Sequence, residues 1–105
     1  MYPFAVYRNR DLRSRTLFPY VVEVQAELFT ELQTCVVVPL SRAGPLTPFP
    51  LIYLTPTVSF ERQAYVLMTP QLAGIARREL GTPVGSLADQ GSAISGAVEF
   101  LLRGF

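Results

Sequence analysis

The first third of the chain has the pattern of an antiparallel hairpin. Residues 2–7 alternate aromatic or β-branched residues with others, which predicts a first strand. The polar stretch Arg8–Arg15 predicts a loop, and the β-rich stretch Leu17–Gln25 predicts the second strand, with Pro19 near its start, where a proline is tolerated. Residues 26–34 show no clear period, so we expect them to be irregular.

Apolar segments in the middle of the chain predict further strands. Cys35–Leu40 is a short continuous apolar run, which is typical of a buried strand. Residues 41–50 contain three prolines and a glycine and predict a surface loop. Leu51–Leu54 and Ala64–Thr69 are predicted to form an antiparallel pair that is connected through residues 57–62.

The last third changes to helical spacing. Pro70 stands where a proline favours the start of a helix, and residues 71–80 predict a short helix that ends before Gly81. The apolar side of this helix is expected to hold Leu72, Ile75, Ala76 and Leu80.

A second, amphipathic helix is predicted from Leu87 nearly to the C-terminus, with Ser86 and Asp89 resembling a capping box at its start. Its apolar stripe follows a spacing of three or four residues through Gly91, Ile94, Val98, Leu101 and Phe105, and Ala93, Ala97, Phe100 and Leu102 widen it. A helix this broadly apolar is buried on two sides, so we expect one side to face a second subunit.

Strands first and helices last predict a mostly β fold of the α+β class, a small antiparallel barrel with a short helix and a terminal helix. The 105 residues form one domain, residues 1–105. The chain is 50% hydrophobic and its mean hydropathy is +0.30. Its apolar runs are too short to span a bilayer, so this excess predicts self-association as a homodimer and no membrane partner.

The composition argues against catalysis. The chain has no histidine, which is the usual acid–base group near neutral pH and the commonest metal ligand. Its formal net charge of +1 gives no strong overall attraction to nucleic acid. We therefore expect a protein that is not an enzyme, with no cofactor, no metal site and no direct nucleic-acid specificity.

The single cysteine, Cys35, rules out an intrachain disulfide. At the start of a valine run it is expected to be a small core residue rather than a nucleophile. The first residues lack the basic and apolar regions of a signal peptide. Both observations predict a cytoplasmic protein.

Charged residues offer two candidate sites. The loop arginines Arg8, Arg10, Arg13 and Arg15 have no aromatic neighbours for base stacking, and form either a solvated loop or a docking site for an acidic segment. Glu23, Glu27 and Glu31 with nearby arginines have no spacing that demands an acid–base pair. We expect these glutamates to balance surface charge.

Five stretches, taken in order along nearly the whole chain, resemble the CcdB family of plasmid toxins. They are Phe4–Tyr7; Val22–Gln25; Val37–Leu40; Leu67–Thr69 with Leu72 and Ala73; and Gly81 with Leu87, Ile94, Ala97, Gly104 and Phe105. The resemblance implies a small SH3-like barrel with a C-terminal helix, in a homodimer. It also implies two partners, a CcdA-type antitoxin that neutralises the toxin and the DNA gyrase A subunit, where the toxin traps the cleaved DNA complex.

By the same resemblance, the gyrase-binding surface comprises Phe4, Tyr7, Ala26, Leu28, Phe29, Glu99, Leu102, Arg103, Gly104 and Phe105. The antitoxin is expected to contact Arg8, Arg10, Arg13 and Arg15. Well-known family members end in Trp-Gly-Ile, whereas this chain ends in Arg103-Gly104-Phe105.

Two alternatives to a gyrase poison stay open. Ribonuclease toxins of the MazF and Kid type share the barrel, and fold alone does not decide between them. The other alternative is a relative that binds an antitoxin but no longer poisons gyrase, because tryptophan is a residue that often dominates binding energy.

Overall fold

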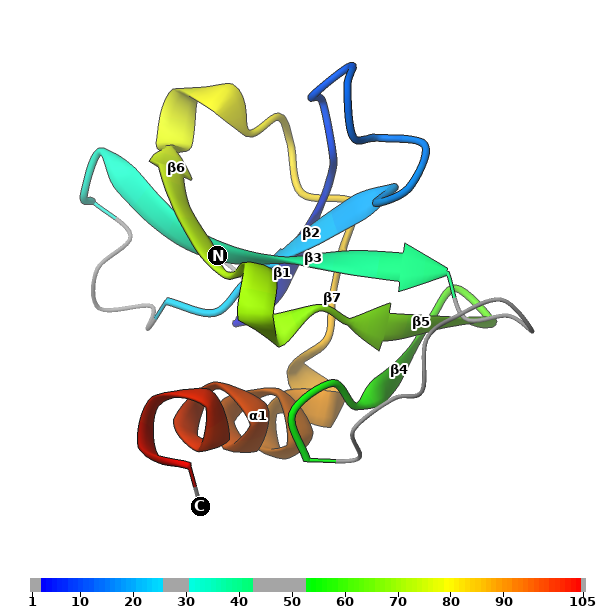
Figure 1. Cartoon of the computed structure of the whole chain (residues 1–105). Coiled ribbons are helices and arrows are strands. Elements are labelled where there is room, and N and C mark those ends of the chain that lie inside the picture. Colours follow the sequence, from blue (N-terminus) through cyan, green and yellow to red (C-terminus); the bar gives the residue numbers. More distant parts are fainter. Residues whose placement is uncertain (1–2, 26–30, 43–52, 105) are drawn as a thin grey trace.

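The computed structural model describes residues 3–25, 31–42 and 53–104 of the chain. It shows a curled antiparallel sheet with one α-helix packed against it (Figure 1). The strands are β1 (Ala5–Arg8), β2 (Tyr20–Glu23), β3 (Thr34–Arg42), β4 (Thr57–Phe60), β5 (Gln63–Leu67), β6 (Ala73–Ala76) and β7 (Gly85–Ser86). The helix is α1 (Gly91–Arg103), and the 3-10 turns are η2 (Thr69–Gln71), η3 (Arg77–Glu79) and η4 (Ala88–Gln90).

The long strand β3 organises the sheet. The strand order is β4-β5-β3-β2-β1-β7, and β6 pairs with β3 off this path. On one of its edges, β3 pairs with β6 along Thr34–Val37 and with β5 along Leu40–Arg42. All of these pairings are antiparallel, so the mostly β fold with a C-terminal helix is confirmed.

The larger core lies between the sheet and α1. Val6 pairs with Val22, and Val22 pairs with Val38, which places three fully buried valines side by side on one face. Ile94 and Ala97 of α1 are fully buried against this cluster. Each buried branched side chain contributes about 1.5–3 kcal/mol, so this row is a main source of stability.

A smaller core occupies the other face of the sheet. Its buried members alternate with those of the first face along the strands, as period-two geometry requires, and Ile75 and Leu80 pack against it. They are Ala5, Tyr7, Val21, Cys35 and Val37. Leu80, in the chain directly after the turn η3, is one of the residues that cover this face.

The predicted helix over residues 71–80 is wrong. Residues 73–76 form the strand β6, and 3-10 turns stand on either side of it, so Gly81 does not follow a helix. Pairing with β3 satisfies the backbone and places Ile75 opposite the buried Cys35. These contacts outweigh a modest helical preference that Gly74 already lowers by about 1 kcal/mol.

The hairpin after residue 52 was also misplaced. Tyr53 and Leu54 form a turn, whereas Thr57–Phe60, predicted as a connection, is the strand β4. Glu61 and Arg62 form the real turn, each with positive φ, which a two-residue hairpin turn of the primed type requires. Leu51, Ile52 and most of the predicted loop 41–50 lie outside the described residues, and β3 runs on to Arg42.

The terminal helix is confirmed, but its start differs. Ser86 does not cap it: the Ser86 hydroxyl donates to the Pro3 carbonyl at 2.6 Å and accepts from the Ala88 N–H at 3.1 Å. The α-helix begins later, at Gly91, where the Phe4 ring lies so close that a Cβ would stand 2.7 Å from it. Among the described residues, no helix combines the length and apolar character that crossing a membrane requires.

Candidate functional site

The last turn of α1 presents four of the expected gyrase contacts at the surface. The Leu102 side chain is 75% exposed. Arg103 Nη1 lies 3.4 Å from Glu99 Oε1, in an ion pair one helical turn long whose side chains are both more than half exposed. Gly104, with φ of 78°, ends the helix by donating its N–H to the Phe100 carbonyl at 2.8 Å. Phe105 lies outside the described residues.

Two of the other expected gyrase contacts, Phe4 and Tyr7, are at least partly buried. Tyr7 is buried, and Phe4 is half-buried against Gly91 with a φ of 53°. Both therefore support the fold, and Phe4 seats the start of α1. Ala26, Leu28 and Phe29 lie outside the described residues.

The sequence did not predict that apolar side chains, among them Tyr53 and Leu101, are exposed near the end of α1. The Tyr53 side chain is 75% exposed, and its ring centroid lies 6.4 Å from that of Phe100. Leu101 is also partly exposed. Tyr53 follows a proline-rich stretch with no periodicity, so no local signal could connect it to a helix that begins much later in the chain.

The arginine loop between β1 and β2 is an ordered turn. The Asn9 side-chain amide donates to Ser14 Oγ at 3.0 Å and to the Phe18 carbonyl at 2.8 Å. The Asp11 carboxylate accepts from the Arg13 N–H at 3.1 Å and from the Ser14 hydroxyl at 3.1 Å. These hydrogen bonds lower the pKa of Asp11, the contact with the Arg13 N–H being the strongest cause. These hydrogen bonds therefore order the backbone that carries the loop arginines.

A cavity of about 720 Å³ lies between this loop and the turn η3. Its floor is apolar and is formed by strand residues including Val21, Val37 and Ile75. Its walls are charged: Arg8, Arg10, Arg13 and Arg78 line it, together with Asp11 and Glu79. Three of the four expected antitoxin contacts therefore meet at one cavity, and Arg15 is exposed outside it.

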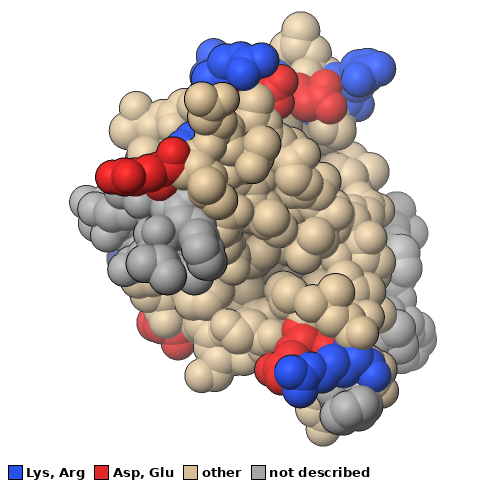
Figure 2. Space-filling model, turned by 90° about the vertical axis from the view of Figure 1, so that its left-hand side faces the viewer, with Lys and Arg blue, Asp and Glu red and all other residues tan. Residues whose placement is uncertain are grey.

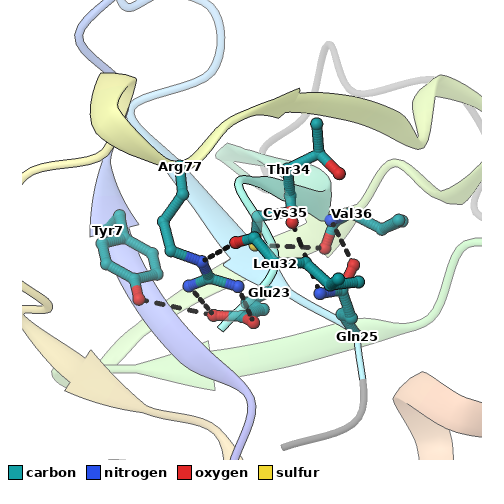
Figure 3. A network of polar contacts seen from close by, with 8 residues as sticks. All are labelled: Tyr7, Glu23, Gln25, Leu32, Thr34, Cys35, Val36 and Arg77. Carbon is teal, nitrogen blue, oxygen red and sulfur yellow. Dashed lines mark hydrogen bonds and ion pairs between the residues drawn. The ribbon is translucent and has the colours of Figure 1, made fainter. Parts of the chain in front are cut away.

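A cluster of buried polar side chains is the second candidate site, and it is shown in Figure 3. Arg77 Nη2 lies 3.1 Å from Glu23 Oε2, and the Tyr7 hydroxyl donates to Glu23 Oε1 at 3.4 Å. The Glu23 side chain is only 8% exposed. The expectation that Glu23 belongs to a surface charge balance is therefore wrong, because β2 turns this carboxylate inward toward the smaller core.

The groups around Glu23 are held in their protonated forms. Burial, and then the Glu23 carboxylate, raises the pKa of the Cys35 thiol to about 12. Burial and the same carboxylate also raise the pKa of Tyr7. A thiol that stays protonated at neutral pH is a poor nucleophile, so these properties support the core role expected for Cys35. No group of acidic or cysteine side chains in the described part of the chain could hold a metal ion.

The cluster and the cavity are separate. The residues that line the cavity do not include Tyr7, Glu23, Cys35 or Arg77. The glutamate–arginine pair therefore does not line this cavity. The Glu23–Arg77 pair joins segments of the fold, and we assign it no role as an acid–base pair.

Comparison with known proteins agrees with this architecture. A search of curated proteins found no match. The sequence model of a protein family described as CcdB protein matches residues 3–104, nearly the whole chain. The chain therefore belongs to the CcdB family, the gyrase-poisoning toxins of toxin–antitoxin systems.

Proposed function

We propose that this protein binds the DNA gyrase A subunit through the C-terminal end of α1 and traps the cleaved DNA complex. The observation that carries the proposal is the last turn of α1, where Leu102 and Arg103 project into solvent. The Leu102 side chain is largely exposed, so it offers apolar surface at the helix end that a partner can cover.

The protein acts as a homodimer in this proposal. Figure 2 shows a face whose charged side chains lie toward the rim, around a broad area without Lys, Arg, Asp or Glu. β6 and the C-terminal end of α1 lie on this side of the molecule (Figure 1). Depletion of charge is typical of the centre of a subunit interface, and a dimer across this face would bring the two helix ends together.

The dimer is tested by light scattering at micromolar concentration. We expect twice the 11.7 kDa mass of the chain. Gly74 of β6 is exposed and has open space around it, so Gly74→Arg adds a charge to β6 and should favour the monomer if β6 lies in the interface. Gln63→Arg, on the exposed end of β5, is the matched control and should leave the mass unchanged.

The antitoxin binds the cavity beside the arginine loop in this proposal. An acidic, disordered segment that orders on binding can place apolar side chains on the floor and carboxylates against Arg8, Arg10 and Arg13. Replacing these three and Arg15 by serine should weaken the complex and flatten its salt dependence. Unchanged affinity at low salt contradicts this role for the loop.

The deciding experiment is regulated expression in cells, followed by a gyrase cleavage assay and an RNA integrity check on the same culture. We expect trapped gyrase–DNA complexes and intact RNA, in a cytoplasmic protein without nuclease activity. Sequence-selective RNA cleavage by the purified protein, abolished by changing one Arg or Glu, supports the ribonuclease alternative instead.

One observation favours a second function. Arg103, which stands where the family tryptophan is expected, is exposed and charged. A positive charge is repelled by a basic, DNA-handling surface, so this chain could bind an antitoxin without poisoning gyrase. Neutralisation by the antitoxin of a cell-killing effect excludes this alternative, whereas antitoxin binding without toxicity supports it.

A further inference from the structure

We propose that Gln90 is a positioning residue that fixes the direction of α1 and so decides where the exposed end of this helix meets its target. The proposal rests on the gyrase binding proposed above, because Leu102 and Arg103 at that end are expected contacts. Gln90 directly precedes α1, yet its side chain makes no hydrogen bond that caps the helix. The Gln90 amide binds the sheet instead.

The Gln90 side chain pairs with the backbone of β4 as a neighbouring strand would. The Ser59 N–H donates to Gln90 Oε1 at 2.8 Å, and Gln90 Nε2 donates to the Ser59 carbonyl at 2.7 Å. A side-chain amide carries both an acceptor and a donor, so it can satisfy both backbone groups of one residue. β4 stands at one end of the sheet order, and this pair of hydrogen bonds fastens the start of α1 to its edge.

A second contact holds the start of the helix from near the other end of the sheet. The Phe4 ring packs so closely on Gly91, the first residue of α1, that a Cβ there would lie 2.7 Å from it. Phe4 has a φ of 53°, which is uncommon for a residue with a side chain, and its carbonyl accepts from the Leu87 N–H at 2.9 Å. Phe4 leads into β1, which is next to last in the sheet order that begins with β4. The base of α1 is therefore tied to both sides of the curled sheet.

The far end of α1 has much less support. Of the described residues of the helix, Ile94 and Ala97 are the fully buried ones, and both lie in its first two turns. Phe100 contacts the ring of Tyr53, whose own side chain is 75% exposed. Figure 1 shows the helix extending away from β4 toward its C-terminal end. The direction of the exposed end is therefore set mainly where the helix begins.

A small change at the base of α1 becomes a larger one at its end. The helix has 13 residues and is about 20 Å long, so a tilt of about 10° moves its last residues by about 3 Å. Binding groups have to be held within about 0.5 Å of their working positions. Gln90 therefore acts through Leu102 and Arg103, which make the contact with the target.

The main test variant is Gln90→Met, which keeps a long side chain and removes both hydrogen bonds to Ser59. Gln90→Glu keeps an acceptor for the Ser59 N–H but, as a carboxylate, has no donor for the Ser59 carbonyl, so it should fall between Gln90→Met and wild type. Gln63→Met, at the exposed start of β5, is the matched control for exchanging glutamine for methionine. Cys35→Ala, in the smaller core, is the control for a general loss of stability.

Two measurements are made on each full-length variant, once circular dichroism has shown that it is folded at the assay temperature. Residual dipolar couplings of the backbone amides report the orientation of α1 relative to β1, β2 and β3, which a loss of stability alone does not change. Calorimetry against a gyrase A fragment from the protein's own host reports target affinity.

We expect the couplings of α1 in Gln90→Met to depart from the wild-type orientation, and the fragment to bind at least about fivefold more weakly. Gln63→Met and Cys35→Ala should keep the wild-type couplings and stay within about twofold of wild-type affinity.

The outcomes separate the two proposals. Wild-type couplings in Gln90→Met overturn the positioning role, whatever the affinity. Altered couplings with wild-type affinity also overturn it, because the direction of α1 then does not matter for binding. An equal loss of affinity in Cys35→Ala overturns it too, because general stability then explains the effect. If wild type binds no gyrase fragment, the proposed function fails, and the couplings alone decide whether Gln90 holds the helix.

Discussion

Two glutamate–arginine ion pairs in this protein have the same chemistry and opposite surroundings. Glu23 and Arg77 meet at 3.1 Å with side chains that are 8% and 25% exposed, and they come from distant parts of the sequence. Glu99 and Arg103 meet at 3.4 Å one turn apart on α1, with side chains that are 59% and 62% exposed. The Glu23–Arg77 pair joins distant segments of the fold, whereas the Glu99–Arg103 pair lies on the surface at the end of α1.

The difference shows that surroundings, rather than residue types, determine what an ion pair does. An exposed pair contributes about 0–1 kcal/mol, because water screens both charges and the side chains lose entropy. Breaking a buried pair leaves one charge without compensation in a poorly solvated site. The buried pair is therefore suited to hold a shape, and the exposed pair can be broken when a partner binds.

The largest effect is expected from Arg77→Met alone. This change leaves the buried Glu23 carboxylate without a compensating positive charge. The free energy of unfolding, measured by chemical denaturation, should therefore fall by about 3–5 kcal/mol. The double variant Glu23→Gln/Arg77→Met should recover much of this loss, because no lone charge remains. If Arg77→Met lowers the free energy of unfolding by less than about 1 kcal/mol, the Glu23–Arg77 pair is no stronger than an exposed ion pair. That result would contradict the comparison of the two pairs.

Alkaline pH tests the surroundings of the buried pair. The Cys35 thiol, with an ordinary pKa of 9.0, has a pKa of about 12 in the folded state, mainly through burial. The folded state thus binds more protons between these values, so stability is complete below about pH 9 and falls as pH rises toward 12. The thiol alone accounts for at most about 4 kcal/mol of this fall.

The measurement is chemical denaturation at a series of pH values, with Cys35→Ala as control. The variant should be less stable at neutral pH and should show a flatter decline above pH 9, with the remaining slope coming in part from Tyr7, whose pKa is also raised. Identical slopes for the two proteins contradict the assignment to Cys35.

At the exposed pair, Arg103→Trp should change binding more than folding. An interface tryptophan can contribute at least about 2 kcal/mol, or about thirtyfold in affinity. We expect this gain for the gyrase A fragment from a host of the well-known toxins, measured by calorimetry beside the fragment from the protein's own host. Glu99→Gln, which breaks the pair without adding a ring, should gain nothing. Nanomolar binding of the foreign fragment by wild type, with no gain in the variant, contradicts the prediction.

The smallest effect is expected from Glu99→Gln on stability. The pair spans one helical turn in solvent, so the free energy of unfolding should change by less than about 0.5 kcal/mol. The change should shrink further in high salt, because exposed charges are screened. A loss comparable to that of Arg77→Met would show that the two pairs do not differ as their exposure indicates.

Local patterns predicted the parts of the fold whose evidence lies within a few neighbouring residues. The alternation around Val6 and Val22 and the apolar run Cys35–Leu40 correctly predicted strands. The spacing of Ile94 and Val98 correctly predicted the terminal helix. The order of short motifs also predicted the family, which the match over residues 3–104 confirms.

The candidate sites were predicted less evenly. The arginine loop was recognised from its composition, but the cavity that joins it to Arg78 depends on how η3 folds back over the sheet. Tyr7, expected at the gyrase surface, is buried against Glu23, because alternation identifies the two faces of a strand without showing what covers each one. Tyr53 reaches Phe100 only through the course of the intervening chain.

The sequence by itself determined the β-rich order, the terminal helix and the family, because hydrophobic period and motif order are properties of neighbouring residues. Only the tertiary structure decided that residues 73–76 are a strand and that Glu23 pairs with Arg77, 54 positions away. Such contacts depend on the path of the whole chain. Pairing with the edge of β3 made residues 73–76 a strand despite their weak preference for a helix. Burial made the Glu23–Arg77 ion pair a contact that holds the fold together.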